Sequence, residues 1–254
     1  MTSIFGQICF KLLSKSKPNN ACNFSILRSK KNRYKFSQYI ILKANKDDYR
    51  PILKIMHEHF YKNEPTCVTL GIRPNAIIDE TALKNMAEGI TLVARCKHDG
   101  SIVGAAINET SNPWDPDLKE KLASNIECQK MKHWLFFQAH VQRFPKLWCR
   151  YDVQKVFELA NMFVKRGLKD NEIMLRLINE SRNLARDYGY KVFRINATKN
   201  IICKMCEMAK MQLTAEIPYC SYVGKNLAPI FNLSHRNKSL KIYIDVNKKR
   251  CRKF

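Results

Sequence analysis

A basic loop runs directly into an amphipathic helical pattern in the stretch VKRGLKDNEIMLRLINESRNLARDYGY, residues 164–190. At such a junction, exposed backbone N–H groups and the helix dipole converge, and many α/β enzymes bind phosphates there. The cations of the loop are Lys165, Arg166 and Lys169. However, Glu172 places a carboxylate in the expected first turn, and Asp170 or Asn171 can cap the helix. The stretch predicts either a weakened phosphate site or an ordinary helix start.

Two short residue pairs have the spacing of metal or redox sites. Cys203 and Cys206 are three positions apart, but they fall near the packed face of a predicted helix with no second pair nearby. His57 and His59 have no third ligand that the sequence fixes. Cysteine pairs of this kind mostly pack as small apolar side chains. We therefore predict no metal site.

The net charge of +23 lies largely at the two ends of the chain. Residues 1–46 carry ten Lys or Arg and no acid, and the tail 248–254 carries five basic residues and no acid, which leaves +8 for the rest. Such ends are typical of arms or targeting segments. The tail can contact anionic lipid or RNA, or only solvate the chain end. Few aromatic residues lie among the basic residues at either end, so bases would find few side chains to stack on, and we expect no nucleic-acid partner.

The segment before Asp47, the first acidic residue, is rich in Ser, Lys and Asn and has an apolar patch near its start. This composition is similar to an organellar transit peptide, and a disordered basic arm is the alternative. Lys11 and the uncharged start argue against a secretory signal. The ten cysteines are scattered, as in reduced proteins. We expect a mitochondrial or cytoplasmic protein that is not secreted and, since no apolar run is long enough, has no membrane span.

Strand and helix periodicities alternate from Tyr39 onward. The pattern predicts strands at 39–43, on both sides of the His-Asp-Gly turn at 98–100, and at 155–162, 191–198, 212–218 and 239–246. It predicts helices at 47–61, 79–88, 171–188 and 201–210, an irregular helical region at 116–144, and a Pro-marked break at 63–72. The order indicates one α/β domain at 37–247, with a mixed twisted sheet and helices on both faces. A basic extension, 1–36, precedes it and a basic tail, 248–254, follows.

The helix at 171–188 has a clear amphipathic pattern. Its predicted inner face consists of Ile173, Leu177, Leu184 and Tyr188. Gly189 follows at the position where a left-handed residue commonly ends a helix.

Three stretches, in this order, resemble insect arylalkylamine N-acetyltransferases of the GNAT superfamily. They are HEHFYKNEPTCVTLGI at 57–72, VARCKHDGSIVGAAINET at 93–110 and GYKVFRINATKNIICKMCEMAKMQLTAEIPYCSY at 189–222. The first resembles a helix ending in Phe and followed by Asp-Glu-Pro, and the third resembles a strand ending in Ala-Thr, a helix with Cys-Glu and a Tyr-x-x-Tyr pair. The resemblance implies a GNAT-like fold and acetyl transfer from acetyl-CoA, as co-substrate, to a primary arylalkylamine.

The resemblance also implies roles for individual residues. An alkylamine is mostly protonated near neutral pH, so a base must remove a proton before the nitrogen attacks a thioester. Glu64 stands at the family's position for that base, and Pro65 favours an extended backbone at Glu64. Thr198 keeps a hydroxyl that the family places near the leaving thiolate or the developing oxyanion. Tyr219 and Tyr222 are further candidate hydroxyls.

The coenzyme loop departs from the superfamily pattern. That pattern has small residues where the backbone approaches the pyrophosphate, and neither is kept here. The resemblance assigns coenzyme contacts to Met162, Val164, Lys169, Asp170, Asn171, Glu172, Ile173 and Met174. One interpretation is therefore an acetyltransferase with weak activity. The other is a non-catalytic GNAT-fold protein that binds a small molecule or partner. The sequence carries no signal for the oligomeric state.

Overall fold

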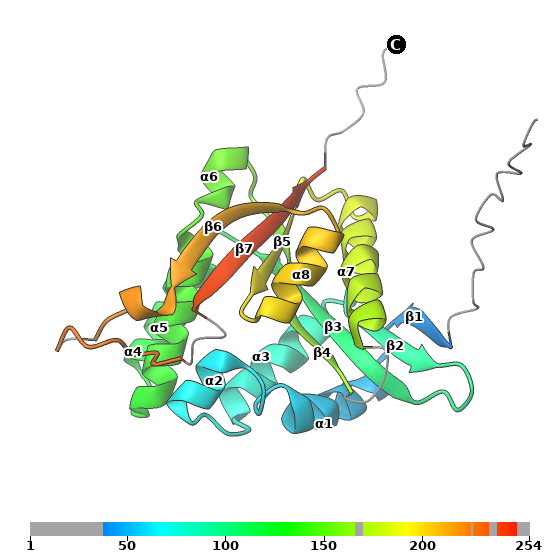
Figure 1. Cartoon of the computed structure of the whole chain (residues 1–254), viewed down its shortest axis with the longest axis horizontal. Coiled ribbons are helices and arrows are strands. Elements are labelled where there is room, and N and C mark those ends of the chain that lie inside the picture. Colours follow the sequence, from blue (N-terminus) through cyan, green and yellow to red (C-terminus); the bar gives the residue numbers. More distant parts are fainter. Residues whose placement is uncertain (1–37, 166–169, 225, 234–237, 248–254) are drawn as a thin grey trace, which may run out of the picture. The chain divides into compact units, whose positions relative to one another are not determined.

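A seven-stranded mixed sheet forms the centre of the structure, a computed structural model that describes residues 38–165, 170–224, 226–233 and 238–247. The strands lie in the order β1-β2-β3-β4-β5-β7-β6 (Figure 1). They are β1 (Tyr39–Lys43), β2 (Leu92–Cys96), β3 (Ile102–Ser111), β4 (Val156–Val164), β5 (Val192–Ala197), β6 (Gln212–Pro218) and β7 (Ser239–Val246). β4 and β5 are parallel, and the other neighbouring pairs are antiparallel. The predicted extension 1–36 and tail 248–254 lie outside the described residues.

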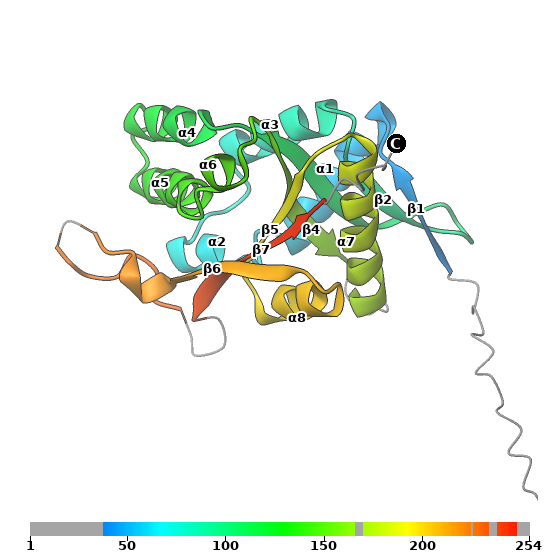
Figure 2. The same ribbon diagram turned by 90° about the horizontal axis from the view of Figure 1, so that it is seen from above.

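Helices cover both faces of this sheet. They are α1 (Tyr49–His59), α2 (Pro65–Leu70), α3 (Ala76–Ala87), α4 (Asp115–Ser124), α5 (Gln129–Arg143), α6 (Leu147–Tyr151), α7 (Asp170–Asp187) and α8 (Asn200–Met208). α7 and α8 share one core with the sheet, whereas α1 and α3 pack into a second core and α5 into a third. Figure 2 shows α8 and α5 on opposite sides of β5 and β7. The predicted mixed sheet with helices on both faces is confirmed.

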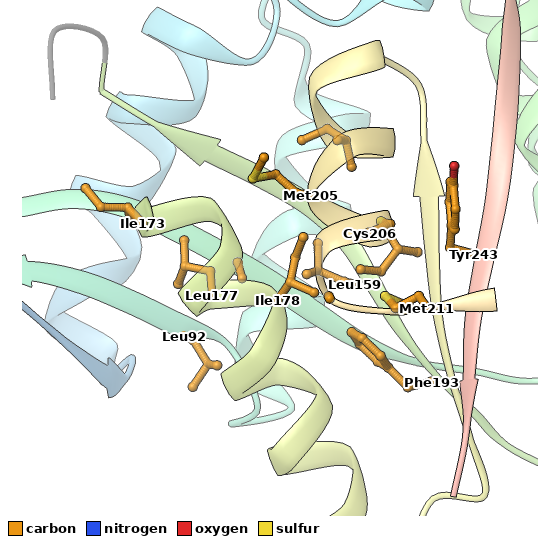
Figure 3. Packing of buried hydrophobic residues seen from close by; sticks show 14 of the residues in the cluster. Leu92, Leu159, Ile173, Leu177, Ile178, Phe193, Met205, Cys206, Met211 and Tyr243 are labelled. Atoms are coloured by element: carbon orange, nitrogen blue, oxygen red, sulfur yellow. The ribbon is translucent and has the colours of Figure 1, made fainter. Parts of the chain in front are cut away.

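The largest core joins α7 and α8 to the sheet (Figure 3). Leu177 and Ile178 come from α7 and Cys206 from α8, and they pack with Leu159 and Phe193 of the central strands. All five side chains are buried, so each removes apolar surface from water. This packing fixes the angle at which α7 and α8 lie on β4 and β5.

Helix α7 agrees with the sequence pattern except at its end. Ile173, Leu177 and Leu184 are buried, and Gly189 has a positive φ of 76° just beyond the helix, as expected. Tyr188 was wrongly predicted to face the core. It lies after the last helical residue and is 53% exposed, and its hydroxyl accepts a hydrogen bond of 2.7 Å from Lys43 Nζ. Its N–H still donates a helical hydrogen bond of 3.0 Å to the Leu184 carbonyl, but its side chain lies past the buried part of the helix and extends to Lys43 of β1.

Several boundaries differ from the predictions for local reasons. The Pro-marked break contains the short helix α2, because Pro65 occupies a first-turn position and Gly71, with φ of 62°, ends the helix. Asn45 caps the turn of Lys46–Asp48 that leads into α1, so the helical segment begins slightly before the predicted range. The irregular region at 116–144 resolves into α4 and α5, and α6 was not predicted. No described helix is long and apolar enough to span a membrane.

The two parallel strands diverge in the middle of the sheet. β4 and β5 pair only over Phe157–Leu159 and Phe193–Ile195. Beyond Leu159, β4 continues beside β3, and beyond Ile195, β5 continues beside β7. Ligands of open α/β sheets commonly bind at the carboxyl ends of parallel strands, and this divergence is such a place.

Candidate active site

A pocket opens where β4 and β5 diverge. The two strands contribute Asn161 and Met162 from β4 and Asn196 from β5, with Thr198 directly after β5. Glu64, at the start of α2, and residues of α3 and α5 close the pocket on the other side. The α3 and α5 residues are Thr81, Asn85, Trp134, Gln138 and Gln142. Segments more than 100 residues apart in sequence therefore meet at one site.

Glu64 lies at the wall of this pocket in the predicted conformation. Its backbone is extended, with φ of −78° and ψ of 117°, and Pro65 follows as the first residue of α2. The residue is only 7% exposed. Thr198 Oγ1 donates a hydrogen bond of 2.9 Å to Glu64 Oε2, and Thr66 Oγ1 lies 3.5 Å from Oε1. Two hydroxyls thus hold the carboxylate at the pocket.

The surroundings of Glu64 suit a general base. Burial raises the pKa of the Glu64 carboxyl above its ordinary value, and Lys199 and the hydroxyls of Thr198 and Thr66 oppose that rise. A base is most effective when its pKa is near the working pH. The raised pKa therefore brings Glu64 closer to the range in which it can accept a proton from a substrate.

The predicted hydroxyl donors occupy different places. Thr198 lines the pocket, but its hydroxyl donates to Glu64, so here it orients that carboxylate. Tyr219 is buried behind Thr198 and donates a hydrogen bond of 3.4 Å to the Thr198 carbonyl. Burial raises the pKa of Tyr219, which disfavours release of its proton. Tyr222 packs against Phe137 of α5, with ring centroids 5.0 Å apart, and neither tyrosine lines the pocket in the described structure.

Comparison with solved structures identifies the architecture. The mosquito arylalkylamine N-acetyltransferase-like protein 5b matches with a TM-score of 0.77 at 18% identity, over 82% of this chain and 100% of that one. The chain has the GNAT acetyltransferase fold. The polyamine N-acetyltransferase of Drosophila melanogaster matches this chain with a TM-score of 0.75 at 18% identity, over 82% and 100% of the two chains. Arylalkylamine N-acetyltransferase 2 of Aedes aegypti does so with 0.75 at 20% identity, over 82% and 98%.

The structural resemblance to these enzymes confirms the fold that the sequence resemblance implied. No protein-family model matches this sequence, and no curated protein matches it.

The residues predicted to contact the coenzyme lie in different parts of the structure. Met162 lines the pocket. Val164 and Ile173 are buried in the main core, and Met174 is partly buried against it. Asn171 and Glu172 are exposed in the first turn of α7, which begins at Asp170. Lys169 lies outside the described residues. Among the described parts of the chain, no residue of α7 lines the pocket.

The two pairs with metal-like spacing have other contacts in the structure. Cys203 and Cys206 are buried in the main core as free thiols. His57 Nε2 lies 2.8 Å from Asp79 Oδ2 on α3. Within the described ranges, no group of three or more His, Cys, Asp or Glu side chains could hold a metal ion.

A buried polar network that the sequence analysis missed forms one wall of the pocket. Arg194 is 1% exposed and donates a hydrogen bond of 2.9 Å to Asn196 Oδ1. Asn196 Nδ2 in turn donates a hydrogen bond of 2.6 Å to Glu158 Oε1. Arg194 and Asn196 alternate with apolar residues on β5, and a charged residue within a buried strand demands a partner. That alternation was the available signal.

Glu109 of β3 extends this network. It is opposite Glu158 in the register of β3 and β4 and accepts a hydrogen bond from Asn85 Nδ2 of α3. Burial, opposed by Lys119 and assisted by Glu158 among other acids, raises the pKa of Glu109 to about 7. Glu109 therefore titrates near neutral pH.

We expect Glu109 to make the folding stability decrease as the pH rises. A carboxyl with a raised pKa binds its proton more tightly in the folded state, so its contribution is complete below its ordinary pKa of 4.5 and is lost as the pH rises through about 7. Compared with Glu109→Gln, the parent should lose about 1 to 3 kcal/mol of unfolding free energy between pH 5 and pH 8. Urea unfolding at both pH values measures this difference.

A matched control for this prediction is Glu180→Gln, which removes the same charge at an exposed position of α7. Its stability should follow that of the parent at both pH values. A Glu109→Gln variant that also follows the parent would show that Glu109 is ionised throughout this range.

Proposed function

We propose that this protein transfers an acetyl group from acetyl-CoA to a primary amine, with Glu64 as the general base. The observation that carries the proposal is the buried Glu64 carboxylate, which Thr198 holds at the pocket and whose pKa is raised by burial. The shared fold with proteins named arylalkylamine and polyamine N-acetyltransferases supports the same reaction class. An arylalkylamine is the acceptor that the sequence resemblance implies.

The reaction needs one proton transfer before the acyl transfer. Glu64, directly or through a water molecule, takes a proton from the ammonium form of the acceptor, and the freed nitrogen lone pair attacks the thioester carbonyl carbon. The tetrahedral intermediate then collapses with cleavage of the C–S bond. The coenzyme leaves as a thiolate that takes up a proton, and the amide nitrogen loses its second proton. Lys199, which lines the pocket, can stabilise negative charge that develops there.

The part of the site that would hold the acetyl-pantetheine arm fits an extended chain with amide groups. Beyond Leu159 the described residues of β4 pair with β3 on one edge only, so backbone groups on the edge that faces β5 have no strand partner. Such an edge can form hydrogen bonds with an extended ligand. Met162 lies on this part of β4 and lines the pocket.

The phosphate end fits less well. Glu172 lies in the first turn of α7, where a carboxylate competes with a phosphate for the helix N-terminus. This feature favours the second candidate function, a non-catalytic GNAT-fold protein that has lost coenzyme binding. The two functions differ in whether acetyl-CoA binds at all.

An amine-dependent release of thiol tests the proposed reaction. The protein is incubated with acetyl-CoA and a panel of primary amines, free thiol is followed with a thiol reagent, and the acetylated amine is identified by mass spectrometry. We expect thiol release that requires both protein and amine, with Glu180→Gln as active as the parent. If no amine in a panel of arylalkylamines and aliphatic amines accelerates thiol release, the enzyme proposal is wrong.

We expect Glu172→Gln to bind acetyl-CoA more tightly than the parent. Removal of one negative charge near the pyrophosphate should relieve repulsion on the order of 1 kcal/mol, or about fivefold in Kd. Glu172→Gly should show the same gain in affinity and, because glycine weakens a helix, a separate loss of about 0.5 to 1 kcal/mol in stability. Lys169→Ala should weaken binding in a salt-dependent way.

Calorimetric titration and thermal unfolding measure these two effects separately. A Kd for acetyl-CoA that stays constant in all three variants would show that the start of α7 takes no part in coenzyme binding.

A further inference from the structure

An apolar stripe runs along the solvent-facing side of α4. Trp114 directly precedes the helix, and Leu118 and Leu122 follow at intervals of four, so the three side chains lie on one face. They are 53%, 55% and 41% exposed. The opposite side of α4 is the packed one, where Pro116 and Ala123 are buried. Single exposed apolar residues are normal, whereas a contiguous set with polar residues around it marks an interaction surface.

The helix that carries this stripe is firmly attached to α5. Arg143 of α5 donates hydrogen bonds of 2.7 Å to Asp117 Oδ1 and 2.5 Å to Glu120 Oε1. Lys119 Nζ donates a hydrogen bond of 2.9 Å to Gln142 Oε1. Figure 2 shows the two helices side by side. Because α4 is already held in place, a partner that binds the stripe has little ordering entropy to overcome.

The stripe is complementary to itself about a two-fold axis at Leu118. When two copies of α4 pack antiparallel with their Leu118 side chains in contact, Trp114 of each copy lies opposite Leu122 of the other. Both residues are four positions from the centre, or about 6 Å along the helix. The large indole therefore meets the smaller leucine at both ends of the contact. Side chains of this size fill the roughly 8 to 10 Å between the axes of packed helices.

Charges beside the stripe favour the same antiparallel arrangement. Asp117 and Lys121 are four positions apart and exposed, so they lie on one flank of the stripe. A two-fold axis at Leu118 brings Asp117 of each copy within about 3 Å, measured along the helix, of Lys121 of the other copy. The Asp117 side chain is 73% exposed beside Arg143, which leaves room for a second cation. A parallel pair would instead place like charges next to each other.

The charge of this segment disfavours anionic partners. Residues 113–127 carry four acids and two lysines, in a chain whose net charge is +23. Membrane surfaces with anionic lipids and nucleic acids bind where basic residues are in excess. The same local composition keeps repulsion between two copies small at this surface.

We infer that the outer face of α4 is the contact surface of an antiparallel, two-fold symmetric dimer of this chain. Three exposed apolar side chains per copy bury less than about 1,200 Å² in total, which is typical of a transient complex, so we expect a dissociation constant in the micromolar range or weaker. The dimer does not depend on the proposed reaction.

Sedimentation velocity of the full chain, from low micromolar to submillimolar concentrations, tests the inference. The sedimentation coefficient of the parent should rise with concentration toward the value of a dimer. Leu118→Glu places two carboxylates against each other on the two-fold axis and should raise the dissociation constant tenfold or more, roughly the cost of like charges at an interface. The matched control is Leu213→Glu, at a leucine of β6 that is 44% exposed, and it should dimerise like the parent.

Lys121→Glu tests the antiparallel arrangement. It places a carboxylate near Asp117 of the second copy, and it should raise the dissociation constant about two- to fivefold, the range of an exposed ion pair. If Leu118→Glu does not fold, as judged by circular dichroism, Leu122→Glu makes the same comparison opposite Trp114.

Three outcomes would contradict the inference. A parent that stays monomeric at every concentration would leave the stripe to a different protein. A parent dimer that Leu118→Glu does not weaken would form through another surface. A dissociation constant that Lys121→Glu leaves unchanged would contradict the antiparallel arrangement.

Discussion

Glu64→Gln is expected to lower kcat by a factor of roughly 10² to 10⁴ near neutral pH, which is the usual contribution of a positioned general base. The glutamine side chain can still accept the hydrogen bond from Thr198, so the local structure should be kept. It cannot accept a proton from the ammonium group of the acceptor. Stopped assays that quantify the N-acetylated amine at saturating acetyl-CoA measure the decrease in kcat.

The pH dependence separates a lost base from a damaged fold. The activity of the parent should rise with pH as the Glu64 carboxyl, whose pKa is raised by burial, loses its proton. The deficit of Glu64→Gln should be largest where the amine is protonated and should narrow toward pH 10, where a free alkylamine with a pKa of about 10.4 becomes abundant. Affinity for acetyl-CoA should change little. Equal activity of variant and parent at every pH would remove Glu64 from the mechanism.

The second large effect concerns stability. Arg194→Met is expected to lower the unfolding free energy by about 3 to 5 kcal/mol, because removal of one partner of a buried ion pair leaves the other charge uncompensated. Here the charge is Glu158, and the carbonyls of Val141 and Gln142 also lose their donors. Denaturant unfolding at pH 7 measures the change.

Two further variants check this explanation. Arg186→Met removes an arginine that is paired with Asp245 at the surface, and it should cost less than about 1 kcal/mol. Adding Glu158→Gln to Arg194→Met should recover part of the loss, because the orphaned charge is then removed. An Arg194→Met protein as stable as Arg186→Met would show that the network contributes little to folding.

Local pattern was sufficient for most of the fold. The alternation in 212–218 and 239–246 predicted β6 and β7 with the boundaries that the structure shows. It could not predict where β4 and β5 separate, because the register of parallel strands depends on packing between distant segments. Tyr188 illustrates the opposite error, in which a helical period was extended one residue past the end of the helix.

The site was predictable only in part. Pro65 indicated the extended backbone at Glu64, but the role of Glu64 came from the family resemblance. The hydrogen bond between Glu64 and Thr198 joins residues 134 positions apart, which no local pattern reveals. The pair Glu109 and Glu158 likewise becomes visible only once β3 and β4 are aligned. Buried charges in strands were the overlooked sign of this network.

The most direct test of the enzyme proposal is a calorimetric titration of the full chain with acetyl-CoA at moderate salt. The account predicts saturable binding of one acetyl-CoA per chain, with the affinity increased in Glu172→Gln and unchanged in Glu64→Gln. Absence of measurable binding in the parent and in Glu172→Gln would contradict it and would leave a GNAT-fold protein that binds something other than the coenzyme.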